Sequence, residues 1–346
     1  MKKRTGTAAV SVVVLSHNRL EDLRANVLSL LAGGSPELEL IVVDNASTDG
    51  SREFLQRVQL RNPAVQIVLM DRNMGVAVGR NAGFRLARGE YIVSLDDDAC
   101  MAVSDIRRVP VLFGVHSRAG ILAFTVCHAK TGEKQNDHGN RVISVANFHG
   151  AAHAIRKVVF DRVGYLDELC TFGGEEFDYS VRCHAAGYET VYLPEVQASH
   201  NSFLRPGPAG ADRREKWVYN YVRVLYKLFP APMAFLYSVR YVYTMVRSGQ
   251  SVYGFPLVRR LLKAACLGRN HGRAVHSPVP AATVSFYSDP GLRPEFGNVP
   301  LDFPTRIAGR WSRLRRKVFP SLSAPNAEDA VKTAGPAPRR THGTSS

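Results

Sequence analysis

Short hydrophobic runs alternate with longer amphipathic segments over the first hundred residues. Continuous hydrophobic runs predict strands at residues 10–17, 38–45, 65–71 and 91–98, and helical spacing predicts helices at 20–31, 51–60 and 76–87. Strands that are hydrophobic on both faces and separated by helices form parallel sheets covered by helices on both sides. The pattern therefore predicts an α/β protein with a Rossmann-like, mostly parallel sheet.

The pattern becomes mixed after residue 119. It predicts a strand at 121–127, a polar hairpin or loop at 131–140, helices at 155–163 and 175–186, and a strand at 190–199. Residues 203–214 are rich in Gly, Pro and Arg, which is typical of a mobile loop, and residues 217–247 are aromatic, basic and helical in period. We therefore expect one large domain at 1–202, with halves at about 8–118 and 119–202, then a basic helical region at 203–320 and a disordered tail at 321–346.

Charge is distributed unevenly along the 346 residues. The formal net charge is +15, of which residues 1–202 carry −1 and residues 203–346 carry +16. The five cysteines have no C-x-x-C spacing, which argues against a zinc ribbon or a disulfide framework and favours a reducing cytoplasm. The start is basic, but the hydrophobic run that follows it is read as a first strand and not as a signal peptide. No hydrophobic run approaches the roughly 18 to 20 residues that cross a bilayer.

Polar residues follow four of the predicted strands, at the sheet edge where α/β proteins bind ligands. They include Asn18 and Arg19 after the first strand, Asp44 and Asn45 after the second, and Asp96, Asp97 and Asp98 after the fourth. Three adjacent carboxylates repel one another unless a cation is present, and a divalent ion bound to substrate phosphates would relieve the repulsion. A solvated acidic turn is the alternative.

Several segments of the chain, taken in the order in which they occur, resemble the inverting nucleotide-sugar glycosyltransferases of family 2, which have the GT-A fold. The resemblance is in particular to the rhamnosyltransferase and cell-surface polysaccharide type. The resemblance covers residues 10 to about 230. It is carried by segments 12–19, 41–51, 73–75, 79–83, 96–98, 150–164, 174–178 and 200–202.

The resemblance implies roles for residues on the donor side. Asp44 would read the uracil or thymine edge, Asp96 would contact the nucleoside, and Asp98 would bind Mg²⁺ or Mn²⁺ with the diphosphate. His200 would complete the metal shell or contact the diphosphate, although a lone histidine is often structural. The remaining donor-side candidates are Asn18, Arg19, Asn45, Arg80, Asn81 and Asp97; Asn18 and Arg19 are alternatively capping and solvated residues, and Arg80 a surface-helix arginine.

The resemblance also places the general base in the segment that begins with Glu175. Family members usually have Glu-Asp-x-Asp here, and the second acid accepts the acceptor hydroxyl proton; this chain has Glu175, Glu176, Phe177 and Asp178. We favour Glu176 over Glu175 as the base, with Asp178 as a further catalytic candidate. Acids in a first helical turn are also stabilised by the helix dipole, which is the structural alternative. The loop at 203–214 is expected to close over the donor.

The basic region suggests a membrane partner. Trp217, Tyr221, Leu225, Phe229, Phe235, Tyr237, Tyr241 and Tyr243 are interleaved with Arg223, Lys227, Arg240 and Arg247, and a second basic cluster spans 306–317. Basic amphipathic segments with aromatic residues bind anionic membrane surfaces. A solvated face, an oligomer contact and nucleic acid are alternatives, but no nucleic-acid recognition motif accompanies the charge.

The function expected from the resemblance is transfer of a sugar from a UDP-, dTDP- or GDP-sugar to a glycan or a lipid-linked acceptor, at the cytoplasmic face of the membrane. A catalytically silent binding protein with the same fold is one alternative, and a sugar nucleotidyltransferase is another. The latter usually has a Gly-rich loop after its first strand, which this sequence lacks. The sugar, the acceptor and the oligomeric state, including a possible homo-oligomer, are left open.

Overall fold

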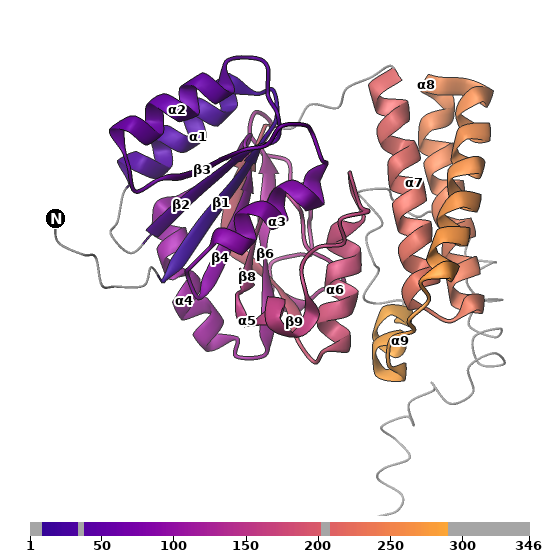
Figure 1. Ribbon diagram of the computed structural model, residues 1–346. Helices are drawn as coiled ribbons and strands as arrows, with labels where there is room; N and C mark the ends of the chain where they lie inside the picture. The colour runs from indigo at the N-terminus through magenta and orange to yellow at the C-terminus, as the bar shows by residue number, and fades with distance from the viewer. Residues whose placement is uncertain (1–8, 34–37, 202–207, 290–346) are drawn as a thin grey trace, which may run out of the picture. The chain divides into compact units, whose positions relative to one another are not determined.

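The computed structural model describes residues 9–33, 38–201 and 208–289, without the side chains of 208–209 and 248–254. Figure 1 shows a central sheet with helices on both faces. The elements in chain order are β1 (Val10–Ser16), α1 (Leu20–Ala32), β2 (Leu38–Asp44), α2 (Ser51–Arg61), β3 (Gln66–Leu69), α3 (Val76–Leu86), β4 (Tyr91–Asp96), β5 (Ala99–Met101), α4 (Val103–Val115), β6 (Ala119–His128), β7 (Ile143–Ser144), β8 (Ala152–Arg156), α5 (Val158–Val163), α6 (Glu175–Ala185), β9 (Glu189–His200), α7 (Pro208–Leu228), α8 (Ala231–Ala274) and α9 (Ala281–Ser288).

The sheet is parallel in its first part and mixed in its second. Its strand order is β3-β2-β1-β4-β8-β6-β9-β5, and β7 pairs with β9 outside this path. β1 is parallel to β2 and β4, and β2 is parallel to β3, as the hydrophobic runs predicted. β8 is antiparallel to both β4 and β6, and β5 is antiparallel to β9. The reversal places the carboxyl end of β4 beside the start of β8.

Two hydrophobic cores lie between the sheet and the helices that cover its two faces. One contains side chains of α1, α2 and α4, among them Leu23, Phe54 and Phe113. The other contains side chains of α3, α5 and α6, among them Phe84 and Tyr179. All residues of β1 are buried because both cores meet at this central strand. Burial on both faces explains why its sequence is continuously hydrophobic.

The prediction of a helix at 155–163 is wrong for its first residues. Residues 152–156 form β8, and the helix α5 occupies only Val158–Val163. Alternate residues of β8 face the two cores, with Ala152 and Ala154 in one and Ile155 in the other. β8 pairs with β4 on one side and with β6 on the other, and these strands provide its backbone hydrogen bonds. The local sequence that predicted a helix does not show this pairing.

The prediction of a mobile loop at 203–214 is wrong for residues 208–214, which are helical. Helix α7 begins at Pro208, where a fixed φ suits a first helical turn, and the remaining residues 203–207 lie outside the described part. The helical prediction for 217–247 is confirmed except at Phe229 and Pro230, which lie between the end of α7 and the start of α8. The second basic cluster and the tail at 321–346 also lie outside the described residues.

The aromatic face of helix α7 packs against α6 and is not exposed as the sequence predicted. Tyr221 of α7 and Phe229, which directly follows the helix, are buried and stack on Phe177 of α6 at centroid distances of 5.4 and 6.1 Å. The basic residues Arg223 and Lys227 of the same helix form ion pairs with Asp167 at 2.8 and 2.6 Å. These side chains are therefore unavailable to a membrane surface.

Helices α7 and α8 approach closely because α8 has glycines at two contact positions. A Cβ at Gly268 would lie 2.4 Å from the Tyr219 carbonyl oxygen, and one at Gly272 would lie 2.4 Å from that of Arg223. Of the described helices, none has both the length and the hydrophobicity needed to cross a bilayer.

Candidate functional site

The carboxyl ends of β1, β2 and β4 meet at one edge of the sheet, because these three strands are parallel and adjacent. Asp44 ends β2, Asp96 ends β4, and Arg19 follows β1. Asn26 of α1 donates to the carbonyl oxygens of Asp96 and Ala99 at 3.1 and 2.9 Å, which fixes the turn between β4 and β5. The sequence reasoning missed Asn26, since nothing in its spacing separates it from other helical residues.

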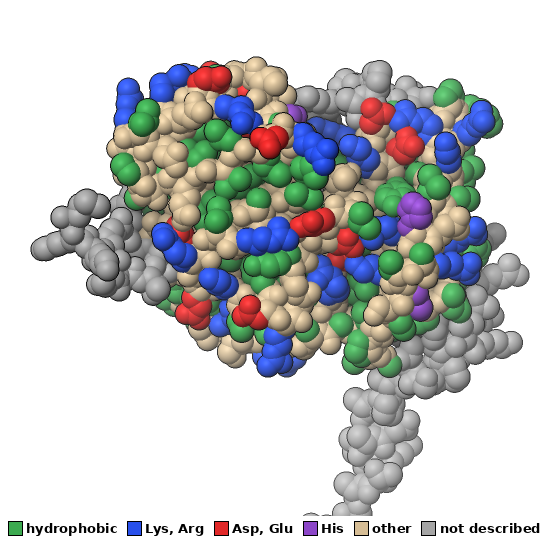
Figure 2. Space-filling view, in the orientation of Figure 1, with side chains coloured by type: hydrophobic (Ala, Val, Ile, Leu, Met, Phe, Trp, Pro, Cys, Tyr) green, Lys and Arg blue, Asp and Glu red, His purple; other side chains and the backbone are tan. Residues whose placement is uncertain are grey.

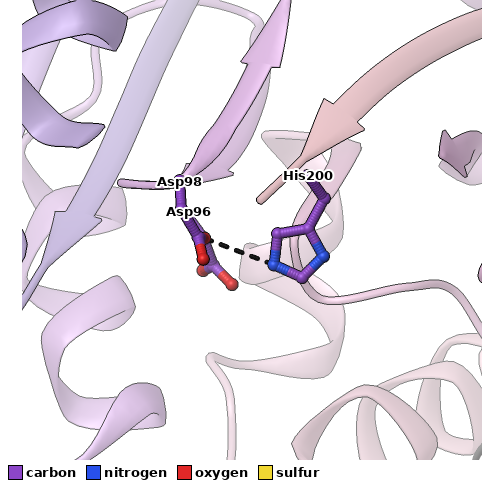
Figure 3. Close-up of side chains that lie close together, drawn as sticks. All are labelled: Asp96, Asp98 and His200. Atoms are coloured by element: carbon purple, nitrogen blue, oxygen red, sulfur yellow. Dashed lines mark ion pairs between the residues drawn. The ribbon is translucent and has the colours of Figure 1, made fainter. Parts of the chain in front are cut away.

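Asp96, Asp98 and His200 converge beyond β4 (Figure 3). One potential ligand atom from each lies within 4.8 Å of the others. The short pairing of β5 with β9 places Ala99 opposite His200, and the backbone N–H of Asn201 donates to the Asp98 carbonyl oxygen at 2.8 Å. The structure thus joins residues about one hundred positions apart in the sequence.

The chemistry of these three side chains fits a divalent cation. Asp98 is buried, and among the described residues neither of its side-chain oxygens accepts a hydrogen bond. It forms an ion pair with Arg19, and Nε2 of His200 lies 3.2 Å from Asp98 Oδ1. Burial lowers the pKa of His200, which favours the neutral imidazole that binds metals. Carboxylate oxygens with one imidazole suit Mg²⁺ or Mn²⁺.

Asp97 points toward β1 and not toward this cluster. Its Oδ2 accepts hydrogen bonds from Ser16 Oγ and the His17 backbone N–H, both at 3.0 Å, and its Oδ1 lies 3.6 Å from Arg19. Burial raises the pKa of Asp97 to about 6, against the opposing effect of Arg19. The middle acid therefore connects β4 to the end of β1.

Asp44 and Asn45 have different surroundings although they are adjacent. Asp44 is fully buried; its Oδ2 accepts from the Ser47 N–H at 3.0 Å, whereas its Oδ1 has no hydrogen-bond partner in the described structure. The Asn45 amide instead holds residues 73–75 through the Asn73 side chain and the Met74 and Gly75 backbones, at 3.0 to 3.1 Å. Of these two adjacent residues, Asp44 thus presents an unpaired acceptor oxygen at this edge and Asn45 does not.

Asn18 and Asn81 also form hydrogen bonds within the protein. Asn18 has a positive φ of 53° and accepts from the Thr48 N–H at 2.7 Å. Asn81 is buried and exchanges two hydrogen bonds with the Leu166 backbone, at 2.9 and 3.1 Å. Asn81 therefore connects α3 to the segment after α5.

Arg80 lies at the centre of the site and is buried, not on a helix surface. Its Nη2 donates to Asp96 Oδ1 at 2.7 Å and to the Gly150 carbonyl oxygen at 2.8 Å. Its Nη1 donates to Glu175 Oε1 at 3.1 Å. One guanidinium thus links the acid that ends β4 with the acid that begins α6.

Glu175 and Glu176 occupy the first turn of α6, after Gly174 in a left-handed conformation with φ of 90°. Glu175 is buried and paired with Arg80, whereas Glu176 is half-buried. Burial raises the pKa of both carboxyls, the charge of Glu176 further raises that of Glu175, and Arg80 opposes these effects. A Cβ at Gly150 would lie 2.3 Å from Glu176 Oε1, so the glycine makes room for this carboxylate.

Asp178 lies on the other face of α6 in an ion-pair network. Its Oδ1 is 2.7 Å from Lys227 Nζ, and its Oδ2 is 2.7 Å from Arg182 Nε. The side chain is fully buried. Both oxygens hold cations of the scaffold, so the structure provides Asp178 with a stabilising role.

Two family models match the chain. The model described as glycosyl transferase family 2 matches residues 11–164, and the one described as glycosyl transferase family group 2 matches residues 91–267, half of the chain. The chain belongs to the family 2 glycosyltransferases. The matched segments of this glycosyltransferase contain Asp44, Arg80, Asp96, Asp98, Glu176 and His200.

Individual relatives agree with this assignment. Glycosyltransferase AglE of Haloferax volcanii is 23% identical over 76% of this chain and 94% of its own length. The succinoglycan biosynthesis protein ExoO of Rhizobium meliloti is 32% identical over 29% of this chain and 28% of its own. Matches to TuaG of Bacillus subtilis and to ExoO span about a third of the length of these relatives.

Solved structures show the fold. The mannosyltransferase PcManGT of Pyrobaculum calidifontis, in complex with GDP-Man and Mn²⁺, matches with a TM-score of 0.52 and 19% identity, over 78% of this glycosyltransferase and 84% of PcManGT. The predicted GT-A fold is thereby confirmed.

Proposed function

We propose that the protein is an inverting, divalent-cation-dependent glycosyltransferase that moves a sugar from a nucleoside diphosphate to a hydroxyl group. The observation that carries this proposal is the convergence of Asp96, Asp98 and His200, joined through Arg80 to the glutamates that begin α6. Transfer of an activated sugar requires both the acidic cluster and the glutamates, because the leaving diphosphate requires positive charge and the acceptor hydroxyl requires a base. Family membership favours this reaction over a silent binding protein or a nucleotidyltransferase.

On the donor side, Asp44 would accept a hydrogen bond from the N–H of a uracil or thymine ring, because its buried Oδ1 lacks a partner among the described residues. Asp96, Asp98 and His200 would hold Mg²⁺ or Mn²⁺, and Arg19 would turn from Asp98 to the diphosphate. When bound, the cation stabilises negative charge on the leaving diphosphate. UDP-, dTDP- and GDP-sugars, hexoses and deoxyhexoses alike, are the donor classes proposed.

On the acceptor side, Glu176 would take the hydroxyl proton. The acceptor oxygen then bonds to the anomeric carbon as the bond to the diphosphate oxygen breaks, which inverts that carbon in one step. Glu176 is preferred to Glu175 because it is half-buried and lies against a glycine, whereas Glu175 is buried against Arg80. Arg80 favours the ionised carboxylate that a base requires.

Turnover by purified full-length protein tests this assignment. Nucleoside diphosphate release is measured with UDP-, dTDP- and GDP-sugars, with Mn²⁺ or Mg²⁺ and a mixture of glycan acceptors, and EDTA should abolish it. Glu176→Gln should lower turnover by about 10²- to 10⁴-fold while the protein stays folded. Release of pyrophosphate would refute the reaction, and full activity of Glu176→Gln would refute the base.

We further propose that the acceptor is a cell-envelope glycan or a lipid-linked sugar, used at the cytoplasmic face of the membrane. Figure 2 shows basic and hydrophobic side chains close together over α7 and α8. Phe235, Val239 and Tyr243 repeat every fourth residue on one face of α8 and are 56%, 52% and 51% exposed. Exposed basic residues of the same helix are Arg247, Arg259, Lys263, Arg269 and Arg273.

Vesicle co-sedimentation tests the membrane contact. The protein should sediment with vesicles that contain anionic lipid and remain in solution with purely zwitterionic vesicles. Val239→Glu should abolish the binding, and Leu60→Glu on the exposed side of α2 is the matched control. Equal sedimentation of both variants would refute the α8 contact.

A further inference from the structure

His200 forms contacts through both of its ring nitrogens. Nε2 faces Asp98 Oδ1 at 3.2 Å, on the side of the ring where Asp96 also lies. Nδ1 lies 2.7 Å from Oε1 of Gln135, which belongs to the segment after β6. The imidazole is therefore held between the acidic cluster and one amide side chain.

Gln135 is fixed in place by the backbone around it. Its N–H donates to the Val126 carbonyl oxygen at 2.7 Å, and Cys127 and Lys134 form a bridge within the same hairpin. The buried side chain of Asn136 accepts from the Val126 N–H at 2.7 Å and donates to the Phe124 carbonyl oxygen at 2.8 Å. The hairpin is thus held on β6, and β6 pairs with β9, where His200 lies.

An amide oxygen accepts hydrogen bonds and cannot donate them. The contact with Gln135 therefore requires a proton on His200 Nδ1, and a neutral ring with this proton has its lone pair on Nε2. That lone pair faces Asp98, whose own oxygens also have lone pairs. Two acceptors that face each other become attractive when a cation lies between them. Histidine ligands of metals usually donate their other ring N–H in this way.

We propose that Gln135 is a positioning residue that fixes the tautomer and the ring orientation of His200, so that Nε2 binds a divalent cation together with Asp96 and Asp98. This inference rests on the proposed function, since it requires the cation site. It gives the polar hairpin at 131–140 a specific task at the site. Gln135 itself does not touch the cation or the substrate.

Mn²⁺ binding tests the proposal without catalysis. Electron paramagnetic resonance of free Mn²⁺, titrated with full-length protein and no nucleotide, gives the dissociation constant. Gln135→Leu should weaken binding about 10- to 100-fold, the usual effect of losing such a partner. Gln135→Glu keeps an acceptor at Nδ1 and should retain the affinity. Glu133→Gln, an exposed position of the same hairpin, is the control and should change nothing.

Two readouts separate positioning from a general structural effect. Removing Gln135 should not weaken binding further once His200 is alanine, so the double variant should match His200→Ala alone. In ¹⁵N-histidine spectra, the His200 signal, assigned from its loss in His200→Ala, should show the Nδ1-protonated tautomer in the unaltered protein. Gln135→Leu should shift it toward the other tautomer.

Each outcome decides a separate point. Unchanged Mn²⁺ affinity in Gln135→Leu, a further loss in the double variant, or an Nε2-protonated ring in the unaltered protein would overturn the role of Gln135 alone. Failure of the unaltered protein to bind Mn²⁺ would overturn the cation dependence in the proposed function, and this inference with it.

Discussion

Replacing Arg80 with glutamine should destabilise the protein strongly, and more so at higher pH. The substitution removes hydrogen bonds to Asp96, Glu175 and the Gly150 carbonyl oxygen. All three bonds involve the charged guanidinium, and hydrogen bonds of charged groups contribute about 1.5 to 3 kcal/mol each. Breaking a buried ion pair usually costs about 3 to 5 kcal/mol. Because Asp96 is 31% exposed and can be solvated again, we expect the free energy of unfolding to fall by about 4 kcal/mol.

The dependence on pH follows from the pKa values of the two glutamates. Burial raises both, and Arg80 opposes the rise, so both pKa values should increase further in Arg80→Gln. An acid whose folded pKa exceeds its unfolded pKa contributes stability at low pH that is lost as the pH rises. The difference between the two proteins should therefore grow from pH 5 to pH 8.

Urea unfolding followed by circular dichroism at both pH values measures this difference. Arg85→Gln on the same helix is the control, because Arg85 and its partner Glu168 are 49% and 46% exposed and such pairs contribute about 0 to 1 kcal/mol. A loss in Arg80→Gln no larger than in Arg85→Gln, or one that is the same at pH 5 and pH 8, would refute the reasoning.

Three further outcomes are expected. Gly150→Ala should displace the Glu176 carboxylate, lowering turnover at least about tenfold with little change in unfolding temperature, since a flexible side chain can move; a loss of stability without loss of turnover would contradict this. The turnover rate should rise with pH through a pKa above the ordinary value of glutamate, and a pH profile that is flat above pH 5 would exclude Glu176 as a raised-pKa base. Lys227→Met should cost about 1.5 to 3 kcal/mol in urea unfolding, because it removes one of the two cations that pair with Asp167 and one of the two that pair with Asp178, whereas Lys134→Met at a more exposed pair should cost under about 1 kcal/mol.

The sequence predicts the first half of the sheet well because its strands are buried on both faces. The run at 10–17 is short and rich in valine, which favours a strand over a buried helix. Residues 155 and 156 were misread as the start of a helix because the short segment 152–156, which has two alanines, fits either structure, and only pairing with two distant strands decides between them. Long-range pairing is not encoded in local periodicity.

The candidate site was predicted in outline but not in its connections. Asp96, Asp98 and His200 lie together as expected, since strand ends determine their place. The partners of Arg80, Asp178 and Gln135 could not be predicted, because each is contacted by residues from other elements. The aromatic periodicity of 217–247 predicted a helix with one apolar face, and the same pattern fits a bilayer or a neighbouring helix. The structure covers part of that face with α6.

The contact of α7 with α6 has a practical consequence for any shortened version of this enzyme. Phe177 lies one residue after Glu176 and is buried beneath Tyr221 and Phe229. Cutting the chain at residue 202 would uncover that ring and leave Asp178 without Lys227. The smallest piece expected to keep its glutamates correctly placed thus includes α7 and Phe229, because these residues hold the helix on which the glutamates lie.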